Sequence, residues 1–167
     1  GNQMHFFLLA LFAVLIAVAD QISKILTVTY VLPAMPAGLP AIDGIFHFSY
    51  AENIGAAWSI LQGARWLFVA IFVALTVLVL VEYFKKPMPF STFERWCIAA
   101  IYGGAMGNII DRIRLGYVVD MIHLDFMNFP VFNVADCFIT CGCIALFVSL
   151  AFFNKQFWKD EKKLKEE

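Results

Sequence analysis

The chain has 167 residues, of which 62% are hydrophobic and 15% are charged, and its formal net charge is −1. A water-soluble domain carries about 25% charged residues, so this chain has too few polar side chains to cover a soluble globule. It also lacks a basic patch, or an interleaving of basic and aromatic residues, of the kind that binds nucleic acid. The composition therefore predicts an integral membrane protein with no nucleic-acid partner.

The chain opens with Gly-Asn-Gln, three residues that precede Met4 and look like a remnant added ahead of the natural start. Four apolar runs follow, each near the length needed to cross about 30 Å of hydrocarbon. Proline interrupts helices, and all six prolines fall outside these runs, which cover residues 6–28, 66–84, 96–111 and 134–153. We expect a mostly α integral membrane protein, with four transmembrane helices in a single membrane domain spanning residues 1–167.

The first run could also be a cleaved signal peptide. However, no basic segment precedes it, and the sequence Asp-Gln-Ile-Ser-Lys follows its apolar core, where a cleavage site would need small residues. We therefore interpret the first run as a retained span.

The distribution of basic residues predicts the orientation of the chain. Lys85, Lys86 and Arg95 lie between the second and third runs, and five more lysines follow Phe153, whereas residues 26–63 contain neither Lys nor Arg. Basic residues collect on the cytoplasmic side of membrane proteins, so both termini are predicted to be cytoplasmic.

The connections 29–64 and 113–132 are then extracytoplasmic. Within them, residues 44–53 and 117–126 are rich in β-branched and aromatic residues, which favour extended structure. We therefore expect a small extracytoplasmic β segment over the outer face.

Ionisable residues in or beside membrane spans are costly and indicate functional sites. Asp20 and Lys24 are four residues apart, so they share a helical face and can pair; the pair either orients the helix or contacts a substrate. Asn108, Asp111 and Arg112 also share a face, and Asp111, next to Arg112 and Arg114, is predicted to stay ionised and structural. The small-residue spacing of the glycines in this run predicts close approach of another helix; these are Gly103 and Gly107.

Asp120 and Asp136 differ from the other carboxylates because no basic residue lies within four positions of either. Asp120 is expected to end a short apolar strand, and Asp136 to lie in the first turn of the fourth helix. If the two carboxyl groups meet, they would share a proton and could hydrolyse a peptide bond by general acid–base catalysis. The alternative is that they are two interfacial aspartates, one of which caps a helix.

Other chemistries have weaker support in the sequence. His47 and His123 stand alone in strand-like segments, and we interpret them as surface or packing residues. The four cysteines have no histidine beside them and fall within apolar runs, so they are interpreted as small apolar residues and not as zinc ligands; they are Cys97, Cys137, Cys141 and Cys143. We expect neither a metal nor a cofactor.

Five motifs, taken together, resemble the lipoprotein signal peptidase (signal peptidase II) family. They occur in the family's order over most of the chain and are DQISK (20–24), ENIGAAWS (52–59), GGAMGNIIDR (103–112), GYVVDMI (116–122) and FNVADC (132–137). The departures are mild: Trp58 and Met121 stand where Phe is usual or frequent, and Cys137 stands where Ser is common. None of them replaces an expected catalytic group.

The resemblance implies an intramembrane aspartyl endopeptidase of the bacterial cytoplasmic membrane, with its site near the extracytoplasmic face. Such enzymes remove signal peptides from diacylglyceryl-modified prolipoproteins and are targets of cyclic-peptide antibiotics. Asp120 and Asp136 match the catalytic pair. The other matching positions, implied to bind substrate or shape the site, are Asp20, Lys24, Asn53, Gly55, Ala56, Asn108, Asp111, Arg112, Asn133 and Ala135.

We further expect the chain to be a monomer among membrane lipids. Two alternatives stay open at this point: a proton-coupled small membrane transporter and a lipid-binding membrane subunit. A transporter would typically have more spans and repeat symmetry than the sequence displays, and a subunit would not explain paired aspartates on one side of the membrane.

Overall fold

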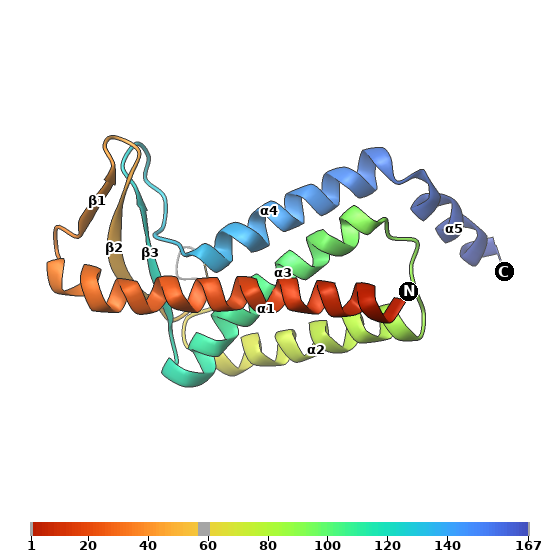
Figure 1. Cartoon of the computed structure of the whole chain (residues 1–167), viewed down its shortest axis with the longest axis horizontal. Coiled ribbons are helices and arrows are strands. Elements are labelled where there is room, and N and C mark those ends of the chain that lie inside the picture. The colour runs from red at the N-terminus through yellow and green to blue at the C-terminus, as the bar shows by residue number, and fades with distance from the viewer. Residues whose placement is uncertain (1, 57–60, 167) are drawn as a thin grey trace.

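The computed structural model describes residues 2–56 and 61–166, so residues 57–60, including Trp58, lie outside the described part of the chain. The fold is mostly helical, with a small sheet at one end of a bundle of long helices (Figure 1). Both ends of the chain lie at the other end of the bundle (Figure 1).

The first helix is longer than the sequence predicts. α1 (Asn2–Leu26) continues without a break through a π-helical turn, η1 (Thr27–Val31), and a 3-10 turn, η2 (Leu32–Ala34). The helix therefore continues six residues past the predicted run 6–28. The hydroxyl groups of Thr27 and Thr29 each donate to a carbonyl four residues earlier, which keeps these polar side chains satisfied within the helix.

The remaining helices lie close to the predicted runs. They are α2 (Arg65–Phe84), α3 (Thr92–Leu115), α4 (Val134–Val148) with its π-helical extension η4 (Ser149–Phe153), and α5 (Lys155–Glu166). Among the described residues, three helices are long and apolar enough to cross a membrane: Asn2–Ala34, Arg65–Phe84 and Val134–Phe153. α3 starts four residues before the predicted run 96–111 and ends four residues after it, because Ser91 caps its start and Gly116, in the left-handed region, ends it.

α3 is the central helix of the bundle, and its glycines explain how closely its neighbours approach. A Cβ atom on Gly103 would lie 2.5 Å from the Ala13 carbonyl oxygen of α1, and one on Gly104 would lie 2.7 Å from the Ala135 carbonyl oxygen of α4. A Cβ atom on Gly107 would collide with the Asp20 carboxylate. The predicted close approach through Gly103 and Gly107 is confirmed, and α1 is the helix that approaches.

The sheet contains three antiparallel strands in the order β1 (Leu39–Ile42), β2 (Phe46–Asn53) and β3 (Val118–Leu124). The prediction of a small β segment is confirmed. One detail is wrong: Asp120 does not end its strand but lies inside β3, opposite Ala51. The strand continues past Asp120 because it pairs with β2 as far as Leu124, a partner that the local sequence does not reveal.

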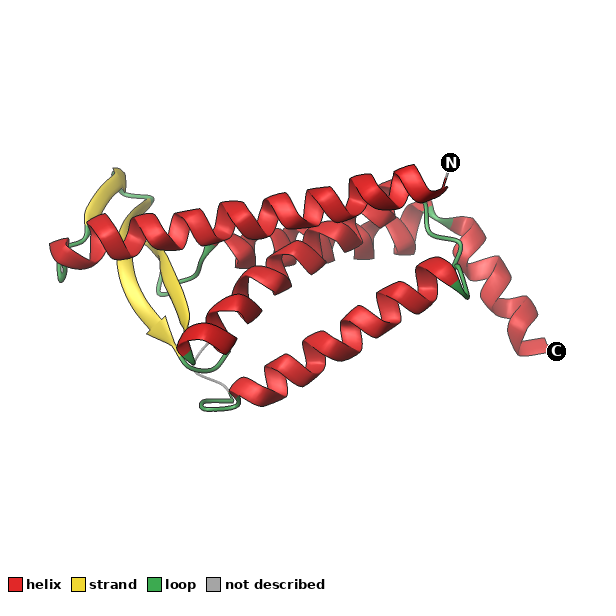
Figure 2. Cartoon of the chain, turned by 60° about the horizontal axis from the view of Figure 1, so that its bottom comes forward, coloured by secondary structure: helices red, strands yellow, loops and turns green. Residues whose placement is uncertain are grey.

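α2 is held more loosely than the other long helices. None of its residues is buried, and it separates from α1 toward the sheet end (Figure 2). Polar contacts join it to α3 at three places: the Thr76 and Tyr102 hydroxyls lie 2.9 Å apart, Arg95 bonds both carboxylate oxygens of Glu82, and Arg65 donates to the Arg112 carbonyl at 3.5 Å. A cavity lies between α2, α3 and α4.

Candidate active site

A buried ion cluster joins α1 to α3 below the sheet. The Lys24 Nζ atom lies 2.7 Å from Asp20 and 3.0 Å from Asp111, and none of the three side chains is more than 3% exposed. The pairing of Asp20 with Lys24, predicted from their spacing of four residues, is confirmed. The predicted cation for Asp111 is wrong: it is Lys24 on another helix, because adjacent residues such as Arg112 project in a different direction around α3.

Backbone and amide groups also donate to the carboxylates of this cluster. Asp20 accepts the Ala135 N–H at the start of α4 at 2.9 Å, and Asp111 accepts the Val119 N–H of β3 at 3.0 Å. The Gln21 side-chain amide donates to the other Asp111 oxygen at 2.9 Å. The cluster therefore ties α1, α3, α4 and β3 together. Gln21 was not singled out from the sequence, although its place beside Asp20 in an otherwise apolar run was an available signal.

Asn108 connects this ion cluster to Asp136. Its side-chain oxygen accepts from the Lys24 ammonium group at 3.0 Å, and its amide nitrogen donates to Asp136 Oδ1 at 3.0 Å. Because an ammonium group can only donate, Lys24 fixes which end of the Asn108 amide points toward Asp136. Through Asn108, Lys24 therefore controls the orientation of a hydrogen-bond donor to Asp136, a residue that it does not itself contact.

Asn133 bridges the two aspartates that the sequence singled out. Its side-chain amide donates to Asp120 Oδ1 at 2.9 Å, while its backbone N–H donates to Asp136 Oδ2 at 3.1 Å. It also caps α4, since its side-chain oxygen accepts the Asp136 N–H at 2.9 Å. Asn133 is fully buried, so the bridge is fixed by packing as well as by hydrogen bonds. Asp136 lies in the first turn of α4, as predicted.

The environments of the two aspartates differ. Asp120 is only 3% exposed, whereas Asp136 is half-buried. Burial, together with the negative charge of Asp136, raises the pKa of the Asp120 carboxyl group from 3.8 to about 7. Hydrogen bonds from Asn133 and Asn53 and the charge of Lys24 act in the opposite direction but do not cancel the rise.

Both carboxyl groups lie on the wall of one large, mainly apolar cavity. Its volume is about 740 Å³, and its wall includes Asp120, Asp136 and side chains from α2, α3 and α4. The α2 side is formed by Phe68, Ile71, Phe72 and Leu75. A paired-carboxyl site is thus joined to an apolar chamber large enough for a lipid-like group.

Arg112 extends from α3 into the same cavity. Its guanidinium group donates to the Gly55 carbonyl at 2.8 Å and lies 4.1 Å from the centre of the Phe68 ring. The position of Gly55 is set by the Asn53 side chain, which accepts its N–H at 2.9 Å. Arg112 therefore fixes the segment after β2 against α2 and places a positive charge near both aspartates.

The structure brings all the predicted site residues into one region. Ten of them form the two connected polar clusters or their direct partners, and Ala56 lines the cavity. Ala135 is fully buried and contributes its backbone N–H to Asp20. His47 and His123 lie elsewhere, stacked across β2 and β3 with ring centres 4.6 Å apart. Within residues 2–56 and 61–166, no group of three His, Cys, Asp or Glu side chains is arranged to hold a metal ion.

The fold and this cavity define a helical membrane protein with a paired-carboxyl site. Signal peptidase (SPase) II is the family whose model matches residues 12–152. Over 157 residues, covering 92% of this chain and 95% of the relative, the chain is 41% identical to a lipoprotein signal peptidase of Streptococcus pyogenes serotype M2 and 40% identical to that of serotype M1.

Solved structures agree with this assignment. A bacterial membrane enzyme determined by the in meso method at 2.3 Å resolution is similar with a TM-score of 0.74 and 29% identity, over 87% of this chain and 88% of that one. A second such structure, determined at 1.9 Å resolution, has a TM-score of 0.69 over 86% and 92% of the two chains. The chain belongs to the signal peptidase II family, and the resemblance inferred from its motifs is confirmed.

Proposed function

We propose that this protein is an endopeptidase that removes signal peptides from diacylglyceryl-modified prolipoproteins, using Asp120 and Asp136 to activate water. One observation carries the proposal: Asn133 holds the two carboxyl groups together on the wall of an apolar cavity. The family is a peptidase family, so neither a transporter nor a lipid-binding subunit is proposed.

Hydrolysis of a peptide bond needs a base, which takes a proton from water, and an acid, which protonates the carbonyl oxygen. Two carboxyl groups can supply both roles when one is ionised and the other is protonated. The raised pKa of Asp120, about 7, allows such a mixed state near neutral pH. The amide and backbone N–H groups around the pair fix its geometry before substrate arrives.

The cavity fits a substrate with both a peptide and lipid chains. Its α2 wall includes apolar side chains that can cover acyl groups, and the polar groups that also line it, Asp120, Asp136 and Arg112 among them, would meet the peptide. The segment that Arg112 holds, Asn53–Ala56, also borders the cavity. The remaining site-shaping residues act by fixing these groups: Asp20, Lys24, Asn108, Asp111, Asn133 and Ala135.

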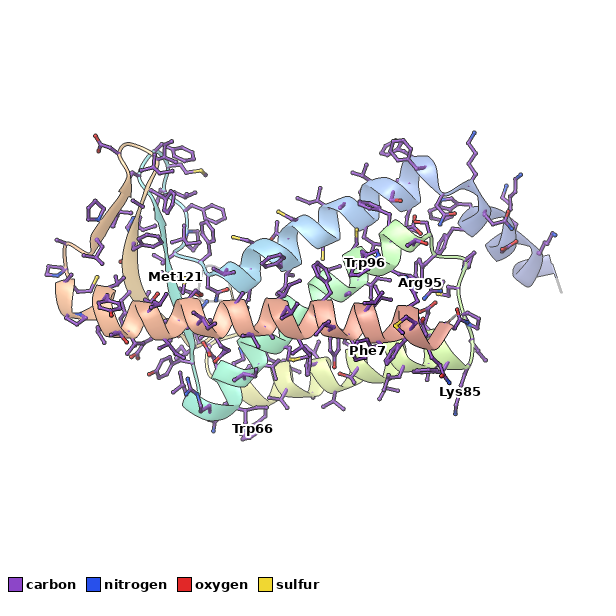
Figure 3. The ribbon with its side chains drawn as sticks, in the orientation of Figure 1. Phe7, Trp66, Lys85, Arg95, Trp96 and Met121 are labelled. Atoms are coloured by element: carbon purple, nitrogen blue, oxygen red, sulfur yellow. The ribbon has the colours of Figure 1, made fainter. Side chains whose placement is uncertain are left out.

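For the topology, we propose four membrane spans with both termini in the cytosol. α3 has 24 residues and would be about 36 Å long, and it lies between α1, α2 and α4, which are apolar enough to span a bilayer (Figure 1). Lys85 and Arg95 lie at the end of the bundle opposite Trp66 and the sheet (Figure 3). Basic residues favour the cytoplasmic side, which supports an extracytoplasmic position for the sheet and the aspartate pair.

The localisation that follows is the bacterial cytoplasmic membrane, as a multi-pass protein and a single membrane domain. We also propose that the chain acts as a monomer, without a metal or another cofactor, and that cyclic peptides resembling the substrate would inhibit it by occupying the cavity.

A cleavage assay tests the function directly. The purified protein in detergent is incubated with a diacylglyceryl-modified prolipoprotein and, as a matched control, with the same prolipoprotein lacking the lipid. We expect a shortened product from the lipidated substrate and little or none from the control. Equal cleavage of both, or of neither, would contradict the proposed substrate.

Cysteine labelling in intact cells tests the topology. In a variant with its native cysteines replaced by serine, a cysteine at Pro87 should resist an impermeant thiol reagent added from outside, whereas one at Gly44 should react. Both sites lie outside the long helices. Strong labelling at position 87 would refute the proposed orientation.

A further inference from the structure

Resting on the function proposed above, we infer that the two aspartates have fixed and different tasks. Asp136 is the general base that takes a proton from water, and Asp120 is the general acid that protonates the substrate carbonyl oxygen. Asn133, Asn108 and Lys24 are positioning residues that prevent the two tasks from being exchanged. The family assignment does not distinguish the two carboxyl groups; their burial and their places in the fold do.

Both carboxylate oxygens of Asp136 accept hydrogen bonds. Asn108 donates to Oδ1 at 3.0 Å, and the backbone N–H of Asn133 donates to Oδ2 at 3.1 Å. Asp136 also lies in the first turn of α4, where the unpaired N–H groups of a helix favour negative charge. Because it is half-buried in the cavity wall, water can reach it.

Asp120 has the opposite environment. It lies on a strand and receives no stabilisation from a helix N-terminus, and only 3% of its surface is exposed. The Asn133 amide donates to its Oδ1 atom at 2.9 Å, and the Asn53 side chain also bonds to this carboxyl group. Burial and the nearby charge of Asp136 raise the pKa of Asp120 to about 7. Near neutral pH, Asp120 is therefore the carboxyl group with a proton to give.

Lys24 maintains the difference between Asp120 and Asp136 by fixing the orientation of the Asn108 amide group. If the Asn108 amide rotated by half a turn, its NH₂ group would face the Lys24 ammonium, and its oxygen would face the Asp136 carboxylate. Both contacts would be repulsive. The amide group of Asn133 also donates to Asn108 Oδ1 at 3.0 Å, which favours the same orientation. Lys24, itself neutralised by Asp20 and Asp111, therefore directs a donor toward Asp136.

The reaction then balances with no further group. In the first step, Asp136 takes a proton from water, the hydroxide oxygen bonds to the scissile carbonyl carbon, and Asp120 gives its proton to the carbonyl oxygen. In the second step, Asp136 gives its proton to the amide nitrogen as the carbon–nitrogen bond breaks. The hydroxyl group formed from the carbonyl oxygen returns a proton to Asp120. Both carboxyl groups finish as they began.

Infrared difference spectroscopy of the full chain in detergent identifies the protonated carboxyl group without requiring turnover. At about pH 6, below the pKa of Asp120, the wild-type protein should have a carbonyl stretching band from a buried protonated carboxyl group. We expect Asp120→Asn to abolish this band and Asp136→Asn to retain it, because burial, the largest cause of the raised pKa, is unchanged in Asp136→Asn. Retention of the band in Asp120→Asn with loss in Asp136→Asn would overturn the assignment.

Two positioning variants provide a kinetic test. Asn108→Ala removes a donor to Asp136, so the acid limb of the profile of kcat/KM against pH should move upward by about one unit. Asn133→Ser keeps a capping oxygen for α4, as Ser91 provides for α3, but removes the donor to Asp120, so the basic limb should move upward by a similar amount. If the roles were reversed, each variant would move the other limb.

The outcomes separate this inference from the function on which it rests. If Asp120→Asn and Asp136→Asn both cleave lipidated prolipoprotein at near wild-type rates, the proposed function fails. If both are inactive but the limbs move in the reversed pattern, or the infrared band belongs to Asp136, the function stands and the division of tasks is wrong. Loss of cleavage, the expected band assignment and the expected limb shifts together would establish both.

Discussion

Two pairs of aspartates lie next to each other in this protein and are bridged in different ways. Asp20 and Asp111 are joined by the ammonium group of Lys24, with distances of 2.7 and 3.0 Å. Asp120 and Asp136 are joined by the neutral Asn133, through its side-chain amide and its backbone N–H. A cation stabilises two negative charges at once, whereas a neutral amide leaves the second charge unfavourable.

The difference between the bridges separates a structural pair from a chemical pair. The oxygens of the lysine-bridged pair accept from donors on three elements of the fold, α1, α4 and β3. The asparagine-bridged pair favours a single negative charge and lies on the wall of the cavity. Asn108 contacts both bridges, accepting from Lys24 and donating to Asp136, so the structural pair determines the geometry of the chemical one.

The largest effect is expected on turnover at the asparagine-bridged pair. Asp120→Asn and Asp136→Asn should each lower cleavage of lipidated prolipoprotein by about 10³–10⁴-fold or more, because each removes an acid–base group. The double variant should be no worse than either single one, since the pair acts as a unit. Rates are measured together with binding of a substrate-like peptide, which should survive because asparagine is nearly isosteric with aspartate.

Asp111→Asn is the matched comparison in the lysine-bridged pair. It should lower the melting temperature and reduce activity only as far as folding is lost. Near-normal cleavage by Asp120→Asn or Asp136→Asn would show that the distinction between the pairs is wrong.

The next largest effect is expected on stability when Lys24 is replaced. Lys24→Met leaves Asp20 and Asp111 buried without the cation that contacts both, and breaking a buried ion pair costs about 3–5 kcal/mol of unfolding free energy. Thermal unfolding in detergent measures this loss. Adding Asp20→Asn and Asp111→Asn to Lys24→Met should recover part of the stability, because no unpaired charge then remains. Wild-type melting of Lys24→Met would contradict a structural role.

A smaller effect should appear in the dependence of stability on pH. The folded-state pKa of Asp120, about 7, lies above its ordinary value of 3.8, so its contribution to stability is present below about pH 4 and is lost as the pH rises to about 7. Relative to the wild-type protein, Asp120→Asn should therefore gain stability between pH 4 and pH 8, by at most about 4 kcal/mol. Melting curves across this range measure the gain. A constant difference between the two proteins would contradict the raised pKa.

The smallest effect is expected at Arg112, which borders the chemical pair without touching it through a hydrogen bond in the described contacts. Arg112→Lys should lower kcat/KM by about tenfold, about 1.4 kcal/mol, because an ammonium group cannot both bond the Gly55 carbonyl and stack on Phe68. Arg114→Lys, at an exposed position of the same helix turn, is the control and should match the wild-type protein. Equal activity of both variants would remove Arg112 from the site.

Much of the fold followed from local sequence patterns. Residues 66–84 and 134–153 were predicted to within one residue of the observed helices, because an uninterrupted apolar run bounded by Pro or polar residues leaves few alternatives in a membrane. The ends of α1 and α3 were less well predicted. α3 carries Glu94, Asn108 and Asp111 among its buried residues. A length inferred from its apolar run alone is therefore too short.

The site was predicted more completely through its motifs than through its chemistry. The resemblance selected all twelve positions, but residue spacing alone gave only the Asp20–Lys24 pair, the shared face of Asn108 and Arg112, and the place of Asp136 in a first helical turn. Reasoning from residue spacing assigned the wrong cation to Asp111 and missed Gln21. Each missed contact joins residues more than 80 positions apart, and no local spacing encodes such a contact.

The sequence by itself determined the apolar helices, the two extended segments and the presence of carboxylates without local cations, because each depends on residues within one or two helical turns. Only the tertiary structure decided which carboxylate meets which partner. Close packing of α1 against Gly103 and Gly107 carries Lys24 to Asp111 and Asn108, and the return of the chain from β3 to α4 places Asn133 between Asp120 and Asp136. Those long-range contacts give one pair of aspartates a cation and the other a neutral amide, and this difference sets their proposed roles.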